Sequence, residues 1–121
     1  MSGQMSYHAG AAAEDIVARL YETQGFVAAK RRWRSDAGEI DLIVTKDRQA
    51  VFVEVKKSDN FAKAAQRVSN RQLRRILASA EIYLTQCSDH QVWDARVDVA
   101  LVDQTGAVEV LENVSIRKSV V

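Results

Sequence analysis

The sequence contains no proline, one cysteine and two histidines, and aromatic residues make up only 7% of it. A single cysteine cannot form an internal disulfide bond, and one cysteine with two separated histidines does not form a Cys/His zinc site. No apolar run approaches the roughly 18 residues that a membrane-spanning helix needs, so we expect no membrane contact. The chain begins without a basic region followed by an apolar stretch, so we expect no secretory signal and a cytoplasmic protein.

What the chain does have is the composition of one ordinary globular domain. Its 121 residues are 47% hydrophobic and 27% charged, which allows a single core of moderate size. We therefore expect one domain over 1–121, with 1–9 and 117–121 as flexible ends. The net charge is only +1, but residues 30–75 hold 13 Lys and Arg against 6 Asp and Glu. This basic region either contacts a polyanion or is a lopsided solvated surface.

Local patterns predict an alternation of helices and strands. Apolar residues at helical spacing, followed by Gly25, predict a helix over about 10–24. Strand-forming runs cover 26–34, 39–46, 50–57, 95–103 and 107–116. A basic, helix-prone stretch follows over 61–86, where Ser69 and Gln72 match a capping box that would begin the long helix near 70. This order predicts an α/β fold, a mixed sheet with helices packed on it.

Two carboxylates fall inside the most apolar of these strands. If the strands 39–46 and 50–57 are joined by a two-residue turn, Asp41 lies opposite Glu54, and Glu39 lies opposite Lys56. Opposed side chains have Cβ atoms about 5 Å apart, so two carboxylates there repel unless a cation lies between them. Lys56 or a bound metal ion would supply that charge.

Mg²⁺ suits the second option, because it is commonly bound by one or two carboxylates and completes its shell with water and phosphate oxygens. Asp41 and Glu54 would be the ligands, and the carbonyl of Val55 would add a third. Lys56 projects from the same strand face as Glu54, where its ammonium would position water or offset charge on a phosphate. The chemistry indicated is metal-assisted hydrolysis of a phosphodiester.

The same residues also permit a purely structural interpretation. Glu39 would pair with Lys56, Glu54 would pair with a basic residue elsewhere, and Asp41 would cap a neighbouring loop. The register is itself a prediction, since a single bulge would turn one strand's side chains to the other face.

Basic residues near this hairpin are candidates for gripping a nucleic-acid backbone. They lie in the strand before it and in the basic, helix-prone stretch after it: Arg31, Arg32, Arg34, Arg67, Arg71, Arg74 and Arg75. The helical arginines face away from an apolar stripe of Leu73, Ile76, Leu77, Ala80 and Leu84. A solvated helix face is the alternative for them, and core packing is the alternative for Trp33, which would otherwise stack on bases.

The segments "GEIDLI" and "VFVEVK" strongly resemble the YraN family of small bacterial proteins, a family of the restriction-endonuclease-like PD-(D/E)XK superfamily. The resemblance covers most of the chain. Further matches are Gly10, Ala13, Glu14, Trp33, Arg34 and the "RVDV" segment at 96–99. The chain departs from the family at Ser58, where an arginine is usual and Lys57 is the neighbouring cation, at Arg32, where asparagine is usual, and at Arg71, where a lysine is expected.

The resemblance implies a restriction-endonuclease-like α/β core with Asp41, Glu54 and Lys56 as the nuclease-like triad. It further implies that Glu14 reaches the site from the first helix, that Gln72 accompanies it from the long helix, and that Glu39 has a supporting role. For Glu14 the alternative is an acid that complements the helix dipole near its N-terminus. For Gln72 the alternative is the capping box.

Two hypotheses follow for the function. The first is a nuclease-like enzyme, dependent on Mg²⁺ or Mn²⁺, that cleaves DNA phosphodiester bonds, with the basic residues, Lys57 included, holding the strand. The second is a nucleic-acid-binding module that keeps the nuclease fold without turnover; a protein-interaction domain is a weaker third. Edge strands and a small core also make a homodimer reasonable.

Overall fold

The computed structural model describes residues 2–86 and 94–114, with the backbone alone described for 2–10. Cys87, His90, Trp93 and the segment 115–121, which includes the end predicted to be flexible, lie outside the described residues.

The elements follow the predicted order, with the basic stretch divided into two helices. They are α1 (Ser2–Thr23), β1 (Val27–Ser35), β2 (Gly38–Lys46), β3 (Gln49–Lys57), α2 (Phe61–Gln66), α3 (Asn70–Gln86), β4 (Asp94–Val102) and β5 (Val108–Leu111). The prediction was wrong about the start of α1, which begins well before residue 10. The hydroxyl of Ser69 accepts from the backbone N–H of Gln72 at 3.1 Å, so α3 begins where the sequence predicted.

The end of α1 is set by Gly25, which has a φ of +92°, a conformation that few residues other than glycine adopt easily. The N–H of Phe26 donates to the carbonyl of Tyr21 at 3.1 Å, and the N–H of Gly25 donates to the carbonyl of Glu22 at 3.0 Å. This is the Schellman arrangement, and the rings of Tyr21 and Phe26 contact edge to face across it. The chain therefore reverses directly from α1 into β1.

The five strands form one mixed sheet in the order β1-β2-β3-β4-β5. Neighbours are antiparallel except β3 and β4, which are parallel and are connected through α2 and α3. In the β2–β3 hairpin, Lys46 pairs with Gln49 and Leu42 pairs with Val53, around a two-residue turn. The predicted register is confirmed over these pairs.

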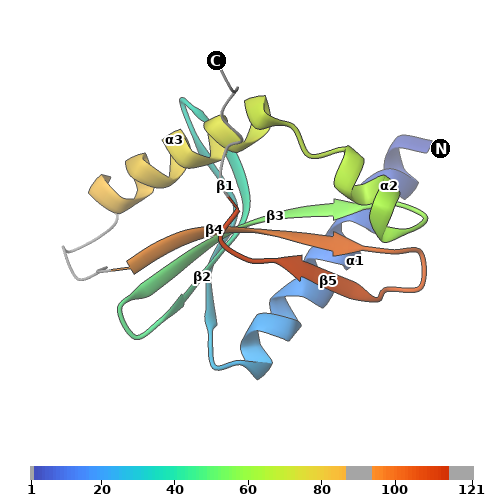
Figure 1. The fold of residues 1–121 in the computed structure, drawn as a ribbon, viewed down its shortest axis with the longest axis horizontal. Helices are drawn as coiled ribbons and strands as arrows, with labels where there is room; N and C mark the ends of the chain where they lie inside the picture. The colour runs from blue at the N-terminus through green and yellow to red at the C-terminus, as the bar shows by residue number, and fades with distance from the viewer. Residues whose placement is uncertain (1, 87–93, 115–121) are drawn as a thin grey trace, which may run out of the picture.

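Helices cover both faces of the sheet, as Figure 1 shows with α1 below and behind the strands and α3 across the top. One core cluster lies between α1 and the sheet and includes Val17, Tyr21, Leu42, Val51 and Val53. The other lies under α2 and α3 and includes Ile43, Phe52, Leu73, Ile76 and Val99. The short apolar strands are therefore buried on both sides, which explains their nearly continuous runs of Val and Ile.

Two apolar side chains, Trp33 of β1 and Leu77 of α3, differ in how they lie against the core. Trp33 packs edge to face on Tyr83 with ring centroids 5.4 Å apart, which confirms that it lies against the core. Leu77 belongs to the predicted apolar stripe of α3 but is 39% exposed, because it lies at the edge of the apolar face of the helix.

One carboxylate is fully enclosed in the core. Asp98 on β4 is 0% exposed. It accepts a hydrogen bond from the Tyr21 hydroxyl at 2.6 Å, from Arg96 Nε at 3.0 Å and from the backbone N–H of Asn113 at 3.0 Å. Burial, reinforced by Asp98, raises the pKa of the Tyr21 hydroxyl. This network joins α1, β4 and the segment that follows β5.

Candidate active site

A cavity of about 410 Å³ opens between α1 and α3 at one end of the β2 and β3 strands. Five elements contribute to its walls, so no single segment of the sequence contains it. The lining residues are Glu14 from α1, Arg32 from β1, Gly38, Glu39 and Asp41 from β2, Glu54 from β3, and Gln72, Arg75 and Ile76 from α3.

Asp41 reaches this cavity because the β2–β3 pairing stops just before it. The last backbone pair of the hairpin is Leu42 with Val53, and beyond it the Asp41 carboxylate accepts a hydrogen bond from the backbone N–H of Val55 at 2.9 Å. The side chain thus replaces the missing strand partner. Because the N–H and C=O of one strand residue point to the same side, the carbonyl of Val55 also faces the β2 side.

Glu54 is the most enclosed acid of the cavity, with only 4% of its surface exposed. Its Oε2 lies 3.2 Å from Nζ of Lys56, and the amide of Gln72 donates a hydrogen bond to the same oxygen. Burial and, after it, the adjoining Asp41 carboxylate raise the pKa of the Glu54 carboxyl, and Lys56 opposes the increase, so that the pKa is about 8. Two acidic groups therefore share one cavity, although Asp41 and Glu54 are not a backbone pair of the hairpin.

Lys56 is the internal counterion of this pair, although it is not one of the residues that line the cavity. The structural alternative, an ion pair between Glu39 and Lys56, was wrong. Glu39 pairs with Arg34 of the neighbouring strand, with Oε2 and Nε 3.5 Å apart, whereas Lys56 pairs with Glu54. The reason is that β2 separates from β3 before Glu39, so the two side chains do not face one another.

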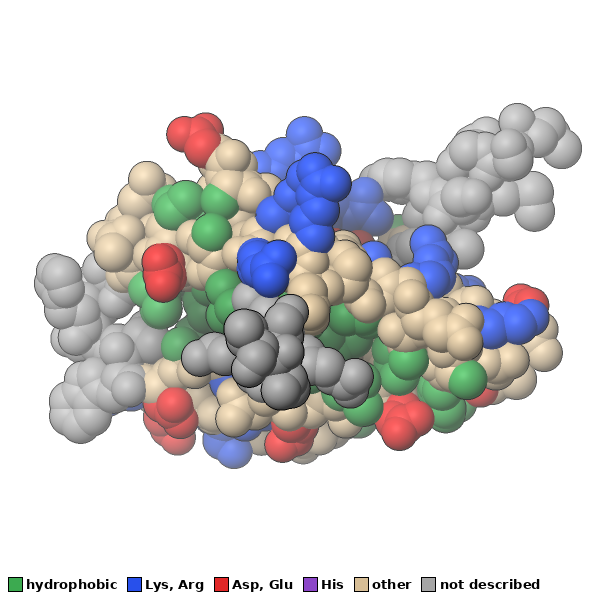
Figure 2. Space-filling model, turned by 45° about the horizontal axis from the view of Figure 1, so that its top comes forward, with side chains coloured by type: hydrophobic (Ala, Val, Ile, Leu, Met, Phe, Trp, Pro, Cys, Tyr) green, Lys and Arg blue, Asp and Glu red, His purple; other side chains and the backbone are tan. Residues whose placement is uncertain are grey.

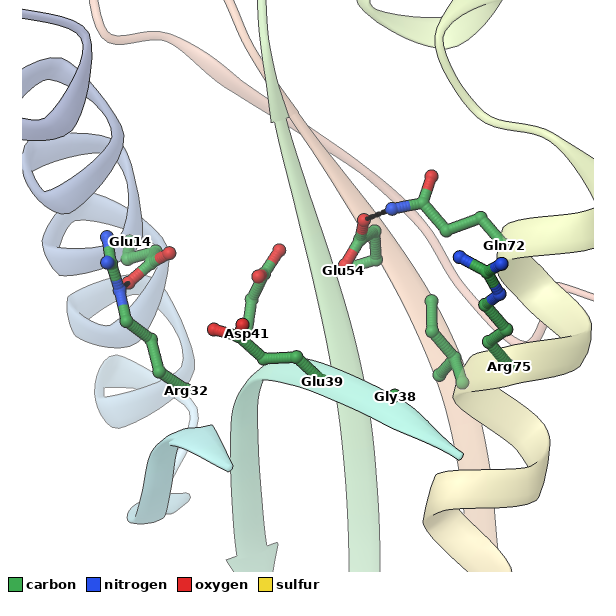
Figure 3. Close-up of a pocket in the computed structure, with 9 residues that line it drawn as sticks. Glu14, Arg32, Gly38, Glu39, Asp41, Glu54, Gln72 and Arg75 are labelled. Atoms are coloured by element: carbon green, nitrogen blue, oxygen red, sulfur yellow. Dashed lines mark hydrogen bonds and ion pairs between the residues drawn. The ribbon is translucent and has the colours of Figure 1, made fainter. Parts of the chain in front are cut away.

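Glu14 lies in the middle of α1, so the alternative that it complements the dipole at the helix N-terminus was wrong. Its Oε1 accepts from Arg32 Nε at 3.1 Å. Burial raises the pKa of the Glu14 carboxyl, Arg32 opposes the increase and Asp41 adds to it. Figure 3 shows Asp41 between Glu14 and Glu54, which brings three acidic side chains from three elements to one cavity.

Gln72 combines both of the roles considered for it. Its backbone N–H bonds to the hydroxyl of Ser69, which is the first half of a capping box. Its side-chain amide does not complete the box and donates to Glu54 instead. The helix start thus positions the amide that fixes the buried carboxyl.

The predicted nucleic-acid-binding residues fall into two groups. Those of β1 already pair with acids: Arg31 with Asp15, Arg32 with Glu14 and Arg34 with Glu39. In α3, Arg71, Arg74 and Arg75 are exposed and pair with no acid among the residues that the structure describes. Before this helix, Arg67 donates to the carbonyl of Lys57 at 2.9 Å. Figure 2 shows Lys and Arg side chains gathered on the upper side of the molecule, where α3 lies.

Sequence reasoning missed two features of the cavity wall. Gly38 lies against α3 with a φ of +150°, and a Cβ built on it would lie 3.5 Å from Cβ of Arg75 and 3.6 Å from Oγ of Ser79. Nothing local in the sequence reveals that approach. Arg75 lines the cavity from the same helix flank as Gln72, and its spacing of three residues from Gln72 was the signal that could have shown this.

The acidic side chains of the cavity offer a metal ion oxygen donors only. Over residues 2–86 and 94–114, no group of three or more His, Cys, Asp or Glu is arranged to hold a metal ion. The candidate set is therefore two carboxylates, Asp41 and Glu54, with the carbonyl of Val55. Such an all-oxygen set suits Mg²⁺ or Mn²⁺ better than zinc, since Mg²⁺ keeps several of its waters.

A five-stranded mixed sheet covered by helices on both faces, with Asp41 and the Glu54-Val55-Lys56 segment where β2 and β3 separate, defines an α/β domain of the restriction-endonuclease-like class. The chain belongs to the family described as "Uncharacterised protein family UPF0102", the YraN family, whose model matches residues 13–102. The predicted family is therefore confirmed. No helix among the described residues is long and apolar enough to cross a membrane.

Bacterial relatives match nearly the whole length of the chain. A UPF0102 protein of Roseobacter denitrificans is 51% identical over 112 residues, which cover 93% of this chain and 87% of the relative. A UPF0102 protein of Cereibacter sphaeroides is 50% identical, over 93% of this chain and 97% of the relative. A third, from Ruegeria pomeroyi, is 47% identical, over 92% of this chain and 90% of the relative.

Proposed function

We propose that this protein is a metal-dependent nuclease that hydrolyses phosphodiester bonds of DNA. The observation that carries the proposal is the meeting of Asp41 with the buried Glu54 in one cavity, beside the ammonium of Lys56. Enclosing two acidic groups together costs folding free energy. A divalent cation would relieve that cost, whereas an unrelated structural role would be served as well by apolar residues.

Three lining residues of the cavity, together with Val55 and Lys56, have a role in this proposal. Asp41 and Glu54, with the Val55 carbonyl, would hold Mg²⁺ or Mn²⁺. When bound, the ion would act as a Lewis acid on the phosphodiester and lower the pKa of water. Gln72 fixes the orientation of the Glu54 carboxylate. Lys56, which contacts the same carboxylate, would donate a hydrogen bond to the attacking water or to a phosphate oxygen that gains charge.

The DNA backbone would lie along α3. Arg71 and Arg74 are exposed on this helix and would contact phosphates that flank the one in the cavity. The β1 arginines contribute less in this proposal, because their charges are already offset by Asp15, Glu14 and Glu39.

The metal site is tested by titrating Mg²⁺ and Mn²⁺ while following the thermal midpoint. Binding to the folded state alone raises the midpoint by mass action, and a concentration 100 times the Kd stabilises by about 2.7 kcal/mol. The wild type should show this rise. Asp41→Asn, which has nearly the same shape but no charge, should start from a higher midpoint without metal and gain little from it. An equal response of both proteins would exclude the proposed ligand set.

The chemistry is tested with purified protein and labelled single-stranded, duplex and branched DNA. Cleavage should require Mg²⁺ or Mn²⁺ and should disappear in Asp41→Ala and Glu54→Ala, whose circular dichroism should match that of the wild type. Cleavage that survives Asp41→Ala unchanged would have to come from another site or from a contaminant.

The second candidate is a nucleic-acid-binding module without turnover. Two observations favour it. The candidate metal set has only two carboxylates, and among the described residues Arg71, Arg74 and Arg75 of α3 have no acidic partner. Binding would then be indifferent to Mg²⁺, weakened by Arg71→Glu with Arg74→Glu, and unaffected by Asp41→Asn. The Mg²⁺ titration above separates the two candidates.

A further inference from the structure

Arg75 differs from the other arginines of α3 in where it lies. It is one of the residues that line the cavity, whereas Arg71 and Arg74 are not. Residues three and four apart share a helix flank, so Gln72, Arg75 and Ser79 form one row along α3. Figure 3 shows the side chain of Arg75 extending from α3 beside Gln72, toward Glu54.

The position of this row is fixed by the β1–β2 hairpin. Ser79 is 0% exposed, and its hydroxyl lies 2.9 Å from the hydroxyl of Ser35. Gly38 has no side chain at the point where the hairpin meets Arg75 and Ser79. The hairpin that presents Asp41 therefore also determines how closely α3 approaches, and with it the place of the Arg75 guanidinium.

In the described part of the chain, Arg32 and Lys56 each pair with an acid of the cavity, whereas Arg75 does not. Arg32, the other arginine of the lining, donates to Glu14, and Lys56 pairs with Glu54. Arg75 has no ion-pair partner within the part of the chain that the structure describes, although four acids line the same cavity. A guanidinium has five donors in a planar fork, which match two oxygens of a phosphate.

We propose that Arg75 binds the phosphate group that enters the cavity, and that it is distinct from Arg71 and Arg74, which contact the flanking backbone. The inference rests on the proposed function, because the carboxylates repel a phosphate until a divalent cation joins them. The contribution of Arg75 to DNA affinity is therefore coupled to the metal ion, while that of Arg74 is not.

The experiment measures the affinity for a fluorescent single-stranded oligonucleotide by anisotropy, with Mg²⁺ and with EDTA, at constant ionic strength. Arg74→Ala is the matched control, because it removes the same charge from the adjacent exposed position. Arg75→Ala should lower the affinity about tenfold with Mg²⁺ and less than twofold with EDTA. Arg74→Ala should lower it by the same factor in both. Arg75→Lys should restore only part of the loss, since an ammonium lacks the planar fork.

The possible outcomes are distinct. Equal losses for Arg75→Ala in both buffers would make Arg75 a backbone contact like Arg74 and overturn the inference, while the wild type's Mg²⁺-dependent affinity would leave the proposed function standing. No effect in either buffer would also overturn it. A wild type whose affinity does not respond to Mg²⁺ would remove the proposed function, and the inference with it. Unchanged thermal midpoints exclude misfolding as the cause.

Discussion

Glu54 is the residue of the site whose ionisation should lower the stability of the fold the most. Its carboxyl has a pKa raised from an ordinary 4.5 to about 8, by burial first and then by Asp41. A carboxyl with a raised pKa binds its proton more tightly in the folded state than in the unfolded state. The stabilisation is fully present below pH 4.5 and is lost as the pH rises to about 8. Without divalent cations, the free energy of unfolding should therefore fall across this window.

Glu54→Gln isolates this effect, because it keeps the shape of the side chain and removes the titration. We expect the wild type to lose a few kcal/mol between pH 5 and 8 relative to Glu54→Gln, measured by urea unfolding in EDTA. Mg²⁺ competes with the proton for the carboxylate, so its addition should flatten the wild-type profile at high pH. Parallel profiles for the two proteins would show that Glu54 titrates normally.

At Arg32 the backbone conformation is unfavourable for arginine, but the side chain makes an ion pair. Its φ is +49°, a left-handed conformation that costs most residues roughly 1 kcal/mol or more and that asparagine tolerates. The side chain donates to the half-buried Glu14 from this position. Arg32→Asn and Arg32→Ala both remove the guanidinium and differ in how well they adopt this backbone conformation.

We therefore expect Arg32→Asn to be more stable than Arg32→Ala by about 1 kcal/mol in chemical denaturation. Equal stabilities would mean that the backbone relaxes at this bulged strand. Neither variant should match the loss of a core residue, because an ion pair that is partly exposed contributes at most about 1 kcal/mol.

Among the elements, the β2–β3 hairpin was the most predictable from the sequence. Alternation and a two-residue turn determine its register, and the predicted pairs from Lys46–Gln49 to Leu42–Val53 are present. The pairing beyond them was not predictable, since the separation of the strands depends on the Asp41 side chain bonding to Val55. Even so, the two acids meet, because the turn had already placed them on corresponding positions.

The helices' contributions were harder to predict. Periodicity showed which face of α3 is apolar, but not that Gly38 and Ser35 would bring it close to Asp41, because that contact joins segments far apart in the chain. Likewise, three arginines of β1, Arg31, Arg32 and Arg34, suggested a nucleic-acid surface. Their acidic partners come from α1 and β2, and neither is visible in a local pattern.

The contrast between α3 and β1 leads to a prediction about salt. Replacing Arg71 and Arg74 by alanine should weaken DNA binding and reduce the slope of log K against log salt by roughly two, about one unit per phosphate contact. The matched double variant, Arg31→Ala with Arg34→Ala, should change the slope by less than one, because Asp15 and Glu39 already neutralise these residues. Equal slopes for the two variants would show that the arginines of β1 contact DNA phosphates as those of α3 do.

At the scale of the whole molecule, the cavity exists only because α1 and α3 are held on opposite faces of one sheet. Glu14 comes from one side and Gln72 from the other, so relative movement of the helices would separate the acidic groups from their partners. The position of α1 depends on its apolar contacts and on the buried hydrogen bond from Tyr21 to Asp98.

That hydrogen bond gives the last prediction. Tyr21 is 2% exposed and Asp98 is 0% exposed, so Tyr21→Phe deletes a donor to a buried carboxylate and should destabilise the protein by about 1–3 kcal/mol. In an Asp98→Asn background the same change should cost less, because the hydroxyl then bonds to a neutral group. Chemical denaturation of the four proteins gives the coupling energy, which should exceed about 0.5 kcal/mol.

Additive losses would mean that apolar packing alone holds α1, and the Mg²⁺ response of Tyr21→Phe would then match the wild type's. If the bond does position α1, that response should weaken although Tyr21 does not line the cavity.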